Sequence, residues 1–263
     1  FEWARGRGLD HIVGPEGFVT GDGFGALIKG FEYPPAMGIP YNYPYYDDFI
    51  KDSGFSKWAD FYSARLPGTF RLPERLSAVA ERGKKRLDLR VVRFTSSDEL
   101  RVLAPRVITA YNDAFADNPR FVPIAGADKR EVTERLLGMV RPDLLKLIAH
   151  GDEVVGFTLV FPNVSRALQR CGGRLFPFGW AYLMWEFRHT HWFDINAAGI
   201  LPKYQGLGAL AVLYDELQKT GAELGADVAE IVQINETNVK MVREFQSLGI
   251  AVHKVHRQYE REL

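Results

Sequence analysis

The fold is decided by residues 197–210, which read AAGILPKYQGLGAL. An apolar segment ends at a proline, and a short turn containing Gly206 and Gly208 leads into a helix-forming run. This order predicts a strand, a tight turn and the N-terminus of a helix. Such a turn leaves consecutive backbone N–H groups without partners, and the helix dipole adds partial positive charge. Because the two glycines let a ligand approach the main chain closely, the stretch predicts a cradle for an anion such as a pyrophosphate.

The segments around this stretch alternate between strand and helix patterns. From residue 89 onward the sequence predicts strands at 89–94, 144–149, 154–161, 193–201, 228–234 and 252–259, and helices at 99–115, 128–140, 206–224 and 238–247. A Gly-Asp turn at 151–152 predicts a hairpin. Together these elements predict a mixed α/β (α+β) fold whose mainly antiparallel sheet is flanked by helices.

The first 88 residues have a different character. They predict strands at 11–15 and 57–65, a short helix at 45–53 and a basic helix at 73–86. We interpret residues 66–88, which contain this basic helix, as a solvated linker and therefore as a domain boundary. Phe1 stands where a chain usually starts with methionine, so we expect a fragment of a longer protein.

Composition excludes several classes of protein. The 263 residues are 46% hydrophobic and 25% charged, which is typical of a globular domain. Lys plus Arg (33) equals Asp plus Glu (33), so the charge predicts neither a nucleic-acid nor a membrane partner. One cysteine, Cys171, excludes a disulfide framework. We therefore expect a cytoplasmic protein without a metal site.

The motif Ile200-x-Pro202-x-x-Gln205-x-x-Gly208 resembles the acyl-CoA signature of the GNAT superfamily of N-acyltransferases. The order of elements from 89 to 263 is similar to that of one whole GNAT domain, including a helix opened by Asn238. Four further motifs resemble a bacterial branch with two GNAT-like domains in tandem: Pro162-Asn163, Phe176-Pro177-Phe178-Gly179, Glu236-Thr237-Asn238 and Lys254-x-x-Arg257-x-Tyr259.

This resemblance implies a domain plan and an activity. Residues 1–65 would be the C-terminal half of a first GNAT-like domain, 66–88 a linker, and 89–263 a complete acyltransferase domain that could form a homodimer. The implied reaction is acyl transfer, acetyl transfer in the expected case, from acyl-CoA to a small-molecule amine or amino-acid-like acceptor. The residues implied in binding the co-substrate are Ala198, Ile200, Gln205, Gly206, Leu207, Gly208, Ala209 and Asn238. Those implied on the acceptor side are Tyr111, Asn112, Phe121 and Asn163.

Direct attack by an amine on the thioester needs a base, and two carboxylates are candidates. Asp194 lies in the core strand, where alternation would place it on one face with Asn196 and Ala198. Glu236 follows the next strand. For each, a surface or capping carboxylate is an equally good interpretation. Asn238 could hold pantetheine or simply cap its helix.

Two departures from the family pattern keep other functions open. Leu210 stands where the family usually has Gly or Ala, and Phe245 stands where many members have a tyrosine that protonates the leaving thiolate. A phenyl ring cannot donate a proton. A non-catalytic acyl-CoA-binding or scaffold module is therefore the alternative. A transferase that uses aminoacyl-tRNA is disfavoured by the neutral charge.

Two weaker signals have simple explanations. His189-x-His191 would place two imidazoles on one strand face, but no third zinc ligand is close in sequence. The aromatic block 176–185 has helical spacing, with Trp180 and Met184 on one side. Packing in a core or lid is the expected role of this block, and an apolar tunnel for an acyl chain or acceptor is the alternative.

Overall fold

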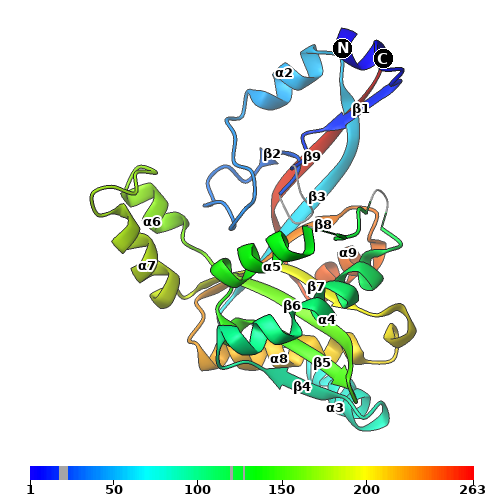
Figure 1. Ribbon diagram of the computed structural model, residues 1–263, viewed down its shortest axis with the longest axis vertical. Coiled ribbons are helices and arrows are strands. Elements are labelled where there is room, and N and C mark those ends of the chain that lie inside the picture. The colour runs from blue at the N-terminus through cyan, green and yellow to red at the C-terminus, as the bar shows by residue number, and fades with distance from the viewer. Residues whose placement is uncertain (18–22, 119–120, 127) are drawn as a thin grey trace. The chain divides into compact units, whose positions relative to one another are not determined.

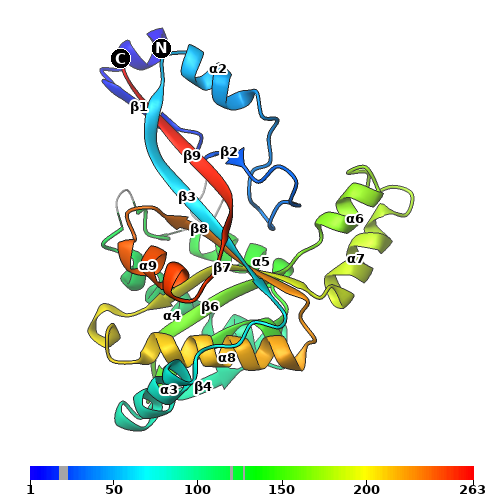
Figure 2. The same ribbon diagram turned by 180° about the vertical axis from the view of Figure 1, so that it is seen from behind.

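The computed structural model describes residues 1–17, 23–118, 121–126 and 128–263. It has the mixed α/β architecture predicted from the sequence, with a large, mainly antiparallel sheet flanked by helices (Figure 1; Figure 2 gives the reverse view). Within the described residues, no helix has the length and apolar character needed to cross a bilayer.

The chain divides into two compact units, each assembled from separate segments. Unit 1 contains residues 1–66, 164–186 and 230–263, and unit 2 contains residues 67–163 and 187–229. The first change of unit, between Leu66 and Pro67, adjoins the predicted boundary after residue 65. Both units draw on the predicted 89–263 domain, and strand β8 (Val228–Asn235) starts in unit 2 and ends in unit 1.

Unit 1 is organised around the last strand, β9 (Val252–Glu262). Three early strands pair with it antiparallel, namely β1 (His11–Gly14), β2 (Ala26–Lys29) and β3 (Ser56–Pro67). The first 65 residues therefore complete a sheet with the far end of the chain. The helices of this unit are α1 (Glu2–Arg5), α2 (Tyr46–Asp52), α6 (Ser165–Arg170), most of α7 (Gly179–His189) and α9 (Val239–Ser247).

Unit 2 contains four antiparallel strands in the order β7-β6-β5-β4. Their bounds are β4 (Arg90–Arg93), β5 (Lys146–His150), β6 (Glu153–Pro162) and β7 (Trp192–Ile200). The predicted hairpin is β5–β6. The helices are α3 (Glu74–Arg86), α4 (Ser97–Phe115), α5 (Asp128–Met139) and α8 (Ala209–Glu223), with short 3₁₀ turns at Pro142–Leu144 and Pro202–Tyr204.

The core of unit 2 explains why α8 lies where it does. Its apolar side buries Ala209, Val212 and Leu213 almost completely, in one cluster with Ile148 of β5 and Ile200 of β7. Burying a Val or Leu side chain contributes about 1.5–3 kcal/mol. This packing holds the first turn of α8 firmly against the end of β7.

Two predictions are corrected by the structure. Residues 26–28, for which the sequence predicts neither strand nor helix, form part of β2, because a four-residue strand is stabilised by its partner β9 rather than by its own pattern. His189 and His191 do not share a strand: α7 ends at His189, and β7 begins at Trp192. The sequence also has a glycine-rich stretch at 21–25, of which residues 21 and 22 lie outside the described residues.

Candidate functional site

The predicted cradle lies in unit 2, between the end of β7 and the start of α8. Gly206 has φ of 72° and Gly208 has φ of 98°. Side chains with a Cβ rarely adopt this left-handed conformation, which explains the two glycines. Gly208 is also the residue immediately before the first turn of α8. The local sequence therefore forms the turn that it predicts.

The backbone amides of this turn are open to a ligand. The amide of Tyr204 donates to Leu201 (2.9 Å), that of Gln205 to Pro202 (3.1 Å) and that of Val212 to Gly208 (3.3 Å). Between them, the amides of residues 206–210 form no hydrogen bond of good geometry with a backbone acceptor among the described residues, although Ala209 itself is completely buried. Consecutive unpaired N–H groups at a helix N-terminus attract anions.

A side-chain hydrogen bond of Gln205 supports the turn. Its Nε2 donates to the carbonyl oxygen of Ile200 at 3.1 Å, which ties the turn to the last residue of β7. On the other flank, Glu153 accepts from the Tyr204 hydroxyl (3.1 Å) and pairs with Lys203 (2.8 Å). The side chain of Gln205 thus holds the turn against the end of β7.

Helix α3 forms the opposite wall of the same site. A surface cavity of about 610 Å³ is lined by Gly206–Gly208 and by five residues of α3: Val79, Arg82, Gly83, Lys85 and Arg86. Gly83 allows the close approach, because a Cβ there would lie 3.2 Å from the carbonyl carbon of Gly208. The Arg86 guanidinium donates to the carbonyl oxygen of Leu207 at 3.2 Å.

Three of the cations of α3 line this cavity and leave it electropositive. Arg82, Lys85 and Arg86 follow i, i+3, i+4 spacing and so share one face of the helix. None of the three forms an ion pair with a carboxylate among the described residues. The basic helix was expected to be a solvated linker. Its spacing and its interior glycine are the sequence signals that identify it instead as part of this site.

Strand β7 carries a bulge that changes which residues share a face. Opposite β6, Phe161 pairs with Asp194, Val160 with Ile195, and Leu159 with Ala197. Asn196 is the extra residue, and beyond it Thr158 pairs with Ala198. Because a bulge shifts the alternation by one, Asp194 and Ala198 lie on opposite faces, contrary to the prediction.

Asp194 is held inside unit 2. Its exposed fraction is 0%, and its two carboxylate oxygens accept from Nδ2 of Asn163 at 3.2 and 2.9 Å. Asn163 is also buried, and its backbone amide donates to the carbonyl oxygen of Trp192 at 2.9 Å. The structure thus brings together a predicted base and a predicted acceptor-side residue, as a buried pair that connects β6 to β7.

The other acceptor-side candidates gather around an aromatic cluster. The Tyr111 ring lies 4.9 Å from Phe115, 5.9 Å from Phe121 and 5.8 Å from Phe157, measured between ring centres. Burial raises the pKa of the Tyr111 hydroxyl. Phe157 covers Gly199 of β7, where a Cβ would lie 2.6 Å from its ring. This cluster therefore lies against the strand that leads to the cradle.

Asn112 has a local structural role. Its Oδ1 accepts from the amide of Ile124, and its Nδ2 donates to the Ile124 carbonyl oxygen, both at 2.9 Å. This double hydrogen bond fixes the loop that carries Phe121 and connects α4 to α5.

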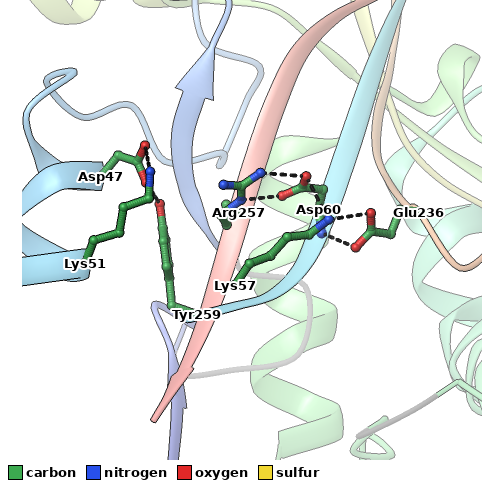
Figure 3. A network of polar contacts seen from close by, with 7 residues as sticks. All are labelled: Asp47, Lys51, Lys57, Asp60, Glu236, Arg257 and Tyr259. Carbon is green, nitrogen blue, oxygen red and sulfur yellow. Dashed lines mark hydrogen bonds and ion pairs between the residues drawn. The ribbon is translucent and has the colours of Figure 1, made fainter. Parts of the chain in front are cut away.

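Glu236 belongs to a polar network in unit 1 (Figure 3). Its Oε2 pairs with Lys57 at 2.7 Å, and its Oε1 accepts from the amide of Asp60 at 3.0 Å. Asp60 in turn accepts two hydrogen bonds from Arg257, at 2.7 and 2.9 Å. Burial raises the pKa of Asp60, but Arg257 and Lys57 outweigh it and leave the pKa below its ordinary value.

The remaining motif residues of unit 1 make structural contacts within that unit. Lys254 pairs with Glu230 at 2.7 Å, with both side chains almost completely buried. The Tyr259 hydroxyl donates to Asp47 at 2.5 Å, and burial followed by this hydrogen bond raises the pKa of Tyr259 (Figure 3). Asn238 caps α9, because its Oδ1 accepts from the amide of Met241 at 3.2 Å. The capping interpretation of Asn238 is confirmed.

The described residues contain no group of three or more His, Cys, Asp or Glu that could hold a metal ion. His191 instead makes a 2.8 Å hydrogen bond with the carbonyl oxygen of Gly225.

Comparisons with known proteins place the chain near acyltransferases. No family model matches it. The bacterial ceramide synthase of Caulobacter vibrioides is 27% identical over 273 residues, covering 100% of this chain and 69% of the relative. Protein YghO of Escherichia coli is 26% identical over 271 residues, covering 99% and 68%.

Two solved structures share the architecture. A GCN5-related N-acetyltransferase from Sphaerobacter thermophilus aligns with a TM-score of 0.52 and 14% identity, covering 87% of this chain. This chain spans 58% of that protein. The glucosamine N-acetyltransferase region of a fungal multi-domain β-N-acetylglucosaminidase aligns with a TM-score of 0.53 and 8% identity, covering 82% of this chain and 22% of that one. The chain therefore has the GNAT fold, as its cradle motif predicts.

Proposed function

We propose that the protein is an acyl-CoA-dependent N-acyltransferase. The observation that carries the proposal is the cavity in unit 2, where the turn residues Gly206–Gly208 and three cations of α3 without ion pairs among the described residues line one hollow. A diphosphate carries at least two negative charges and many acceptor oxygens, so it suits both walls. Arg82 and Arg86 can each donate two parallel hydrogen bonds to a phosphate.

The Caulobacter relative supports an amine as the acceptor. A ceramide contains an amide bond, and that relative is named a bacterial ceramide synthase. At 27% identity over the whole chain, we carry over the type of bond formed and not the particular product. The proposed acceptor class is a primary amine, and the test includes long-chain amino alcohols beside small amines.

The proposed reaction is direct. The amine nitrogen attacks the thioester carbonyl carbon, a C–N bond forms, the C–S bond breaks, and CoA leaves as a thiolate that takes up a proton. A backbone N–H between Ala198 and Ile200 would stabilise the oxyanion. A thiolate is only a moderate base, so CoA can leave without a dedicated acid to protonate it. The ammonium form of the acceptor must first lose a proton to a base.

The two carboxylates suit different roles in this reaction. Glu236 has a side chain that is 26% exposed, so a substrate ammonium can approach it. Asp194 is fully buried against Asn163. We therefore propose Glu236 as the base and Asp194 as a positioning residue that holds β7 in its bulged form.

A second candidate function follows from Phe245. This residue is the buried residue of α9, at 2% exposed. At its position the family resemblance implies a tyrosine that protonates the leaving thiolate. A protein that binds acyl-CoA without transferring the acyl group would keep the cradle and lack such an acid.

Ligand-induced stabilisation tests the cradle, since a ligand that binds only the folded chain raises Tm. Acetyl-CoA and longer acyl-CoAs should raise Tm of the wild type. They should raise it much less for Arg82→Gln/Lys85→Gln. The matched control, Arg75→Gln/Lys84→Gln, removes the same charge from α3 outside the cavity and should behave as the wild type. No shift at saturating acyl-CoA would reject both candidate functions.

The release of the CoA thiol, measured with a panel of amines, then separates the transferase from the binding module. Release that depends on the amine supports the transferase, and a Tm shift without release supports the binding module. Glu236→Gln should lower kcat and leave the acyl-CoA Tm shift and the Tm of the free protein near the wild type. Asp194→Asn should lower kcat together with the Tm of the free protein, because it disturbs the buried pair with Asn163.

A further inference from the structure

The helical hairpin α6–α7 carries several strongly exposed apolar side chains. Figures 1 and 2 both show α6 and α7 side by side, joined by residues 171–178. The exposed fractions reach 84% at Phe176 and 69% at Phe178, and about half of each of four other side chains is exposed. This set, the hairpin patch, consists of Leu175, Phe176, Phe178, Trp180, Tyr182 and Met184.

The patch does not serve as core. The sequence predicted packing in a core or lid from the spacing of Trp180 and Met184, but these are 49% and 47% exposed. In α7 the buried residues are Gly179 and Glu186, neither of which is a large apolar side chain. Large apolar side chains exposed together on one short segment are typical of an interaction site.

The tip of the hairpin is held in shape by its own hydrogen bonds. The amide of Trp180 donates to Leu175, and its indole Nε1 donates to Pro177, both at 3.0 Å. Gly179 lies so close to the preceding turn that a Cβ would come within 1.9 Å of the Arg174 carbonyl oxygen. A preformed surface loses little conformational freedom when it binds.

Charge indicates what the patch binds. Residues 165–185 contain three arginines, Arg166, Arg170 and Arg174, and no Asp or Glu. The nearest acid, Glu186, is 8% exposed. Arg170 and Arg174 are exposed, and neither forms an ion pair among the described residues. The hairpin therefore carries +3 in a chain whose total charge is zero.

We propose that the hairpin patch docks on the surface of a bilayer that contains anionic lipids. Trp and Tyr place an apolar ring below the headgroups and a polar atom among them. Arginine guanidinium groups pair with lipid phosphates, and a cationic segment is drawn to an anionic leaflet. A second copy of the chain is a poorer occupant, since a symmetric contact would bring +3 against +3.

The net charge of the whole chain predicted no membrane partner, whereas the local charge of the hairpin favours one. Screening limits the reach of a charge to about 8 Å at physiological salt, so a membrane would respond to the hairpin and not to the sum over the chain.

Vesicle cosedimentation with the whole chain tests this proposal. The wild type should sediment with equimolar phosphatidylcholine–phosphatidylglycerol vesicles and much less with phosphatidylcholine alone. Phe176→Ser/Phe178→Ser should lower binding at least tenfold, and Arg170→Gln/Arg174→Gln should remove the preference for the anionic vesicles. These side chains are exposed, so circular dichroism and the acyl-CoA Tm shift should match the wild type.

Matched controls replace exposed residues elsewhere. Phe49, 64% exposed, lies on α2 beside Asp48 and Asp52, and Arg130 is exposed on α5. Phe49→Ser and Arg130→Gln should bind vesicles as the wild type does. Equal binding by the Phe176→Ser/Phe178→Ser variant, or sedimentation with neither vesicle, would overturn the proposal. So would a concentration-dependent dimer that dissociates in that variant, since the patch would then bind a second copy.

Discussion

Replacing Arg257 by methionine should destabilise unit 1, because it leaves a buried carboxylate without its main partner. Asp60 is 7% exposed and accepts two hydrogen bonds from Arg257, at 2.7 and 2.9 Å. Removing one member of a buried ion pair costs about 3–5 kcal/mol. The Arg257 side chain is 21% exposed, and Lys57 remains 3.1 Å from Asp60. We therefore expect a smaller loss of unfolding free energy, about 2–3 kcal/mol.

The same pair predicts how stability depends on pH. In the wild type the pKa of Asp60 lies below its ordinary value of 3.8. A lowered pKa contributes stability above the unfolded value, and that contribution is lost as pH falls through the folded value. In Arg257→Met the effect of burial is no longer offset by Arg257, so the pKa of Asp60 rises. The difference between wild type and variant should therefore be largest near pH 7 and shrink toward about pH 4.

Urea unfolding at several pH values measures this difference. Lys57→Gln is the control on the same carboxylate, and because Lys57 is 40% exposed it should cost about 0.5 kcal/mol. The reasoning fails if both variants lose the same stability, or if the loss in Arg257→Met is independent of pH.

Three further predictions concern single positions in the site. Gly208→Ala should lose about 2 kcal/mol of unfolding free energy and weaken acyl-CoA binding, because φ is 98° and the new Cβ would lie 3.3 Å from Val79. Gly206→Ala has open space around the new Cβ and should lose about 1 kcal/mol. Equal losses of the two variants in urea unfolding would contradict this. Asn238→Ala removes the α9 cap and should cost about 1 kcal/mol, with Asn238→Ser close to the wild type; an unchanged unfolding midpoint in the alanine variant would disprove the capping role. Asn112→Ala should speed amide exchange at Ile124, since both hydrogen bonds to that residue are lost, and protection equal to the wild type would argue against it.

Local sequence was sufficient to predict the turn before α8, but not the bulge beside it. Gly206 and Gly208 need left-handed φ angles that few other residues adopt, so their spacing before a helix-forming run indicates the turn directly. The extra residue at Asn196 exists only in relation to the pairing of β7 with β6. Alternation along the sequence therefore predicted that Asp194 and Ala198 share one face of the strand. The observed register of β7 against β6 places them on opposite faces.

Tertiary contacts also decided which amphipathic segments are buried. The basic segment of α3 was interpreted as a linker because its charge suits water. Gly83, however, lets that helix pack against Gly208 while its cations line a cavity. The opposite error concerns α7, where Trp180 and Met184 have core-like spacing but remain exposed. Periodicity identifies a helix and its apolar side, but the partner of that side comes from the rest of the fold.

A net charge of zero hides how the charges are distributed. Several acidic side chains are engaged locally: Asp60 by Arg257, Glu216 by Arg93 and Asp215 by Lys219. Arg82, Lys85 and Arg86 of α3 and Arg170 and Arg174 of the α6–α7 hairpin have no such partners among the described residues. Because charges are screened within about 8–10 Å, a ligand at either place meets a cationic surface. Variants that remove the same charge at different positions on α3 therefore separate a local effect from one of total charge.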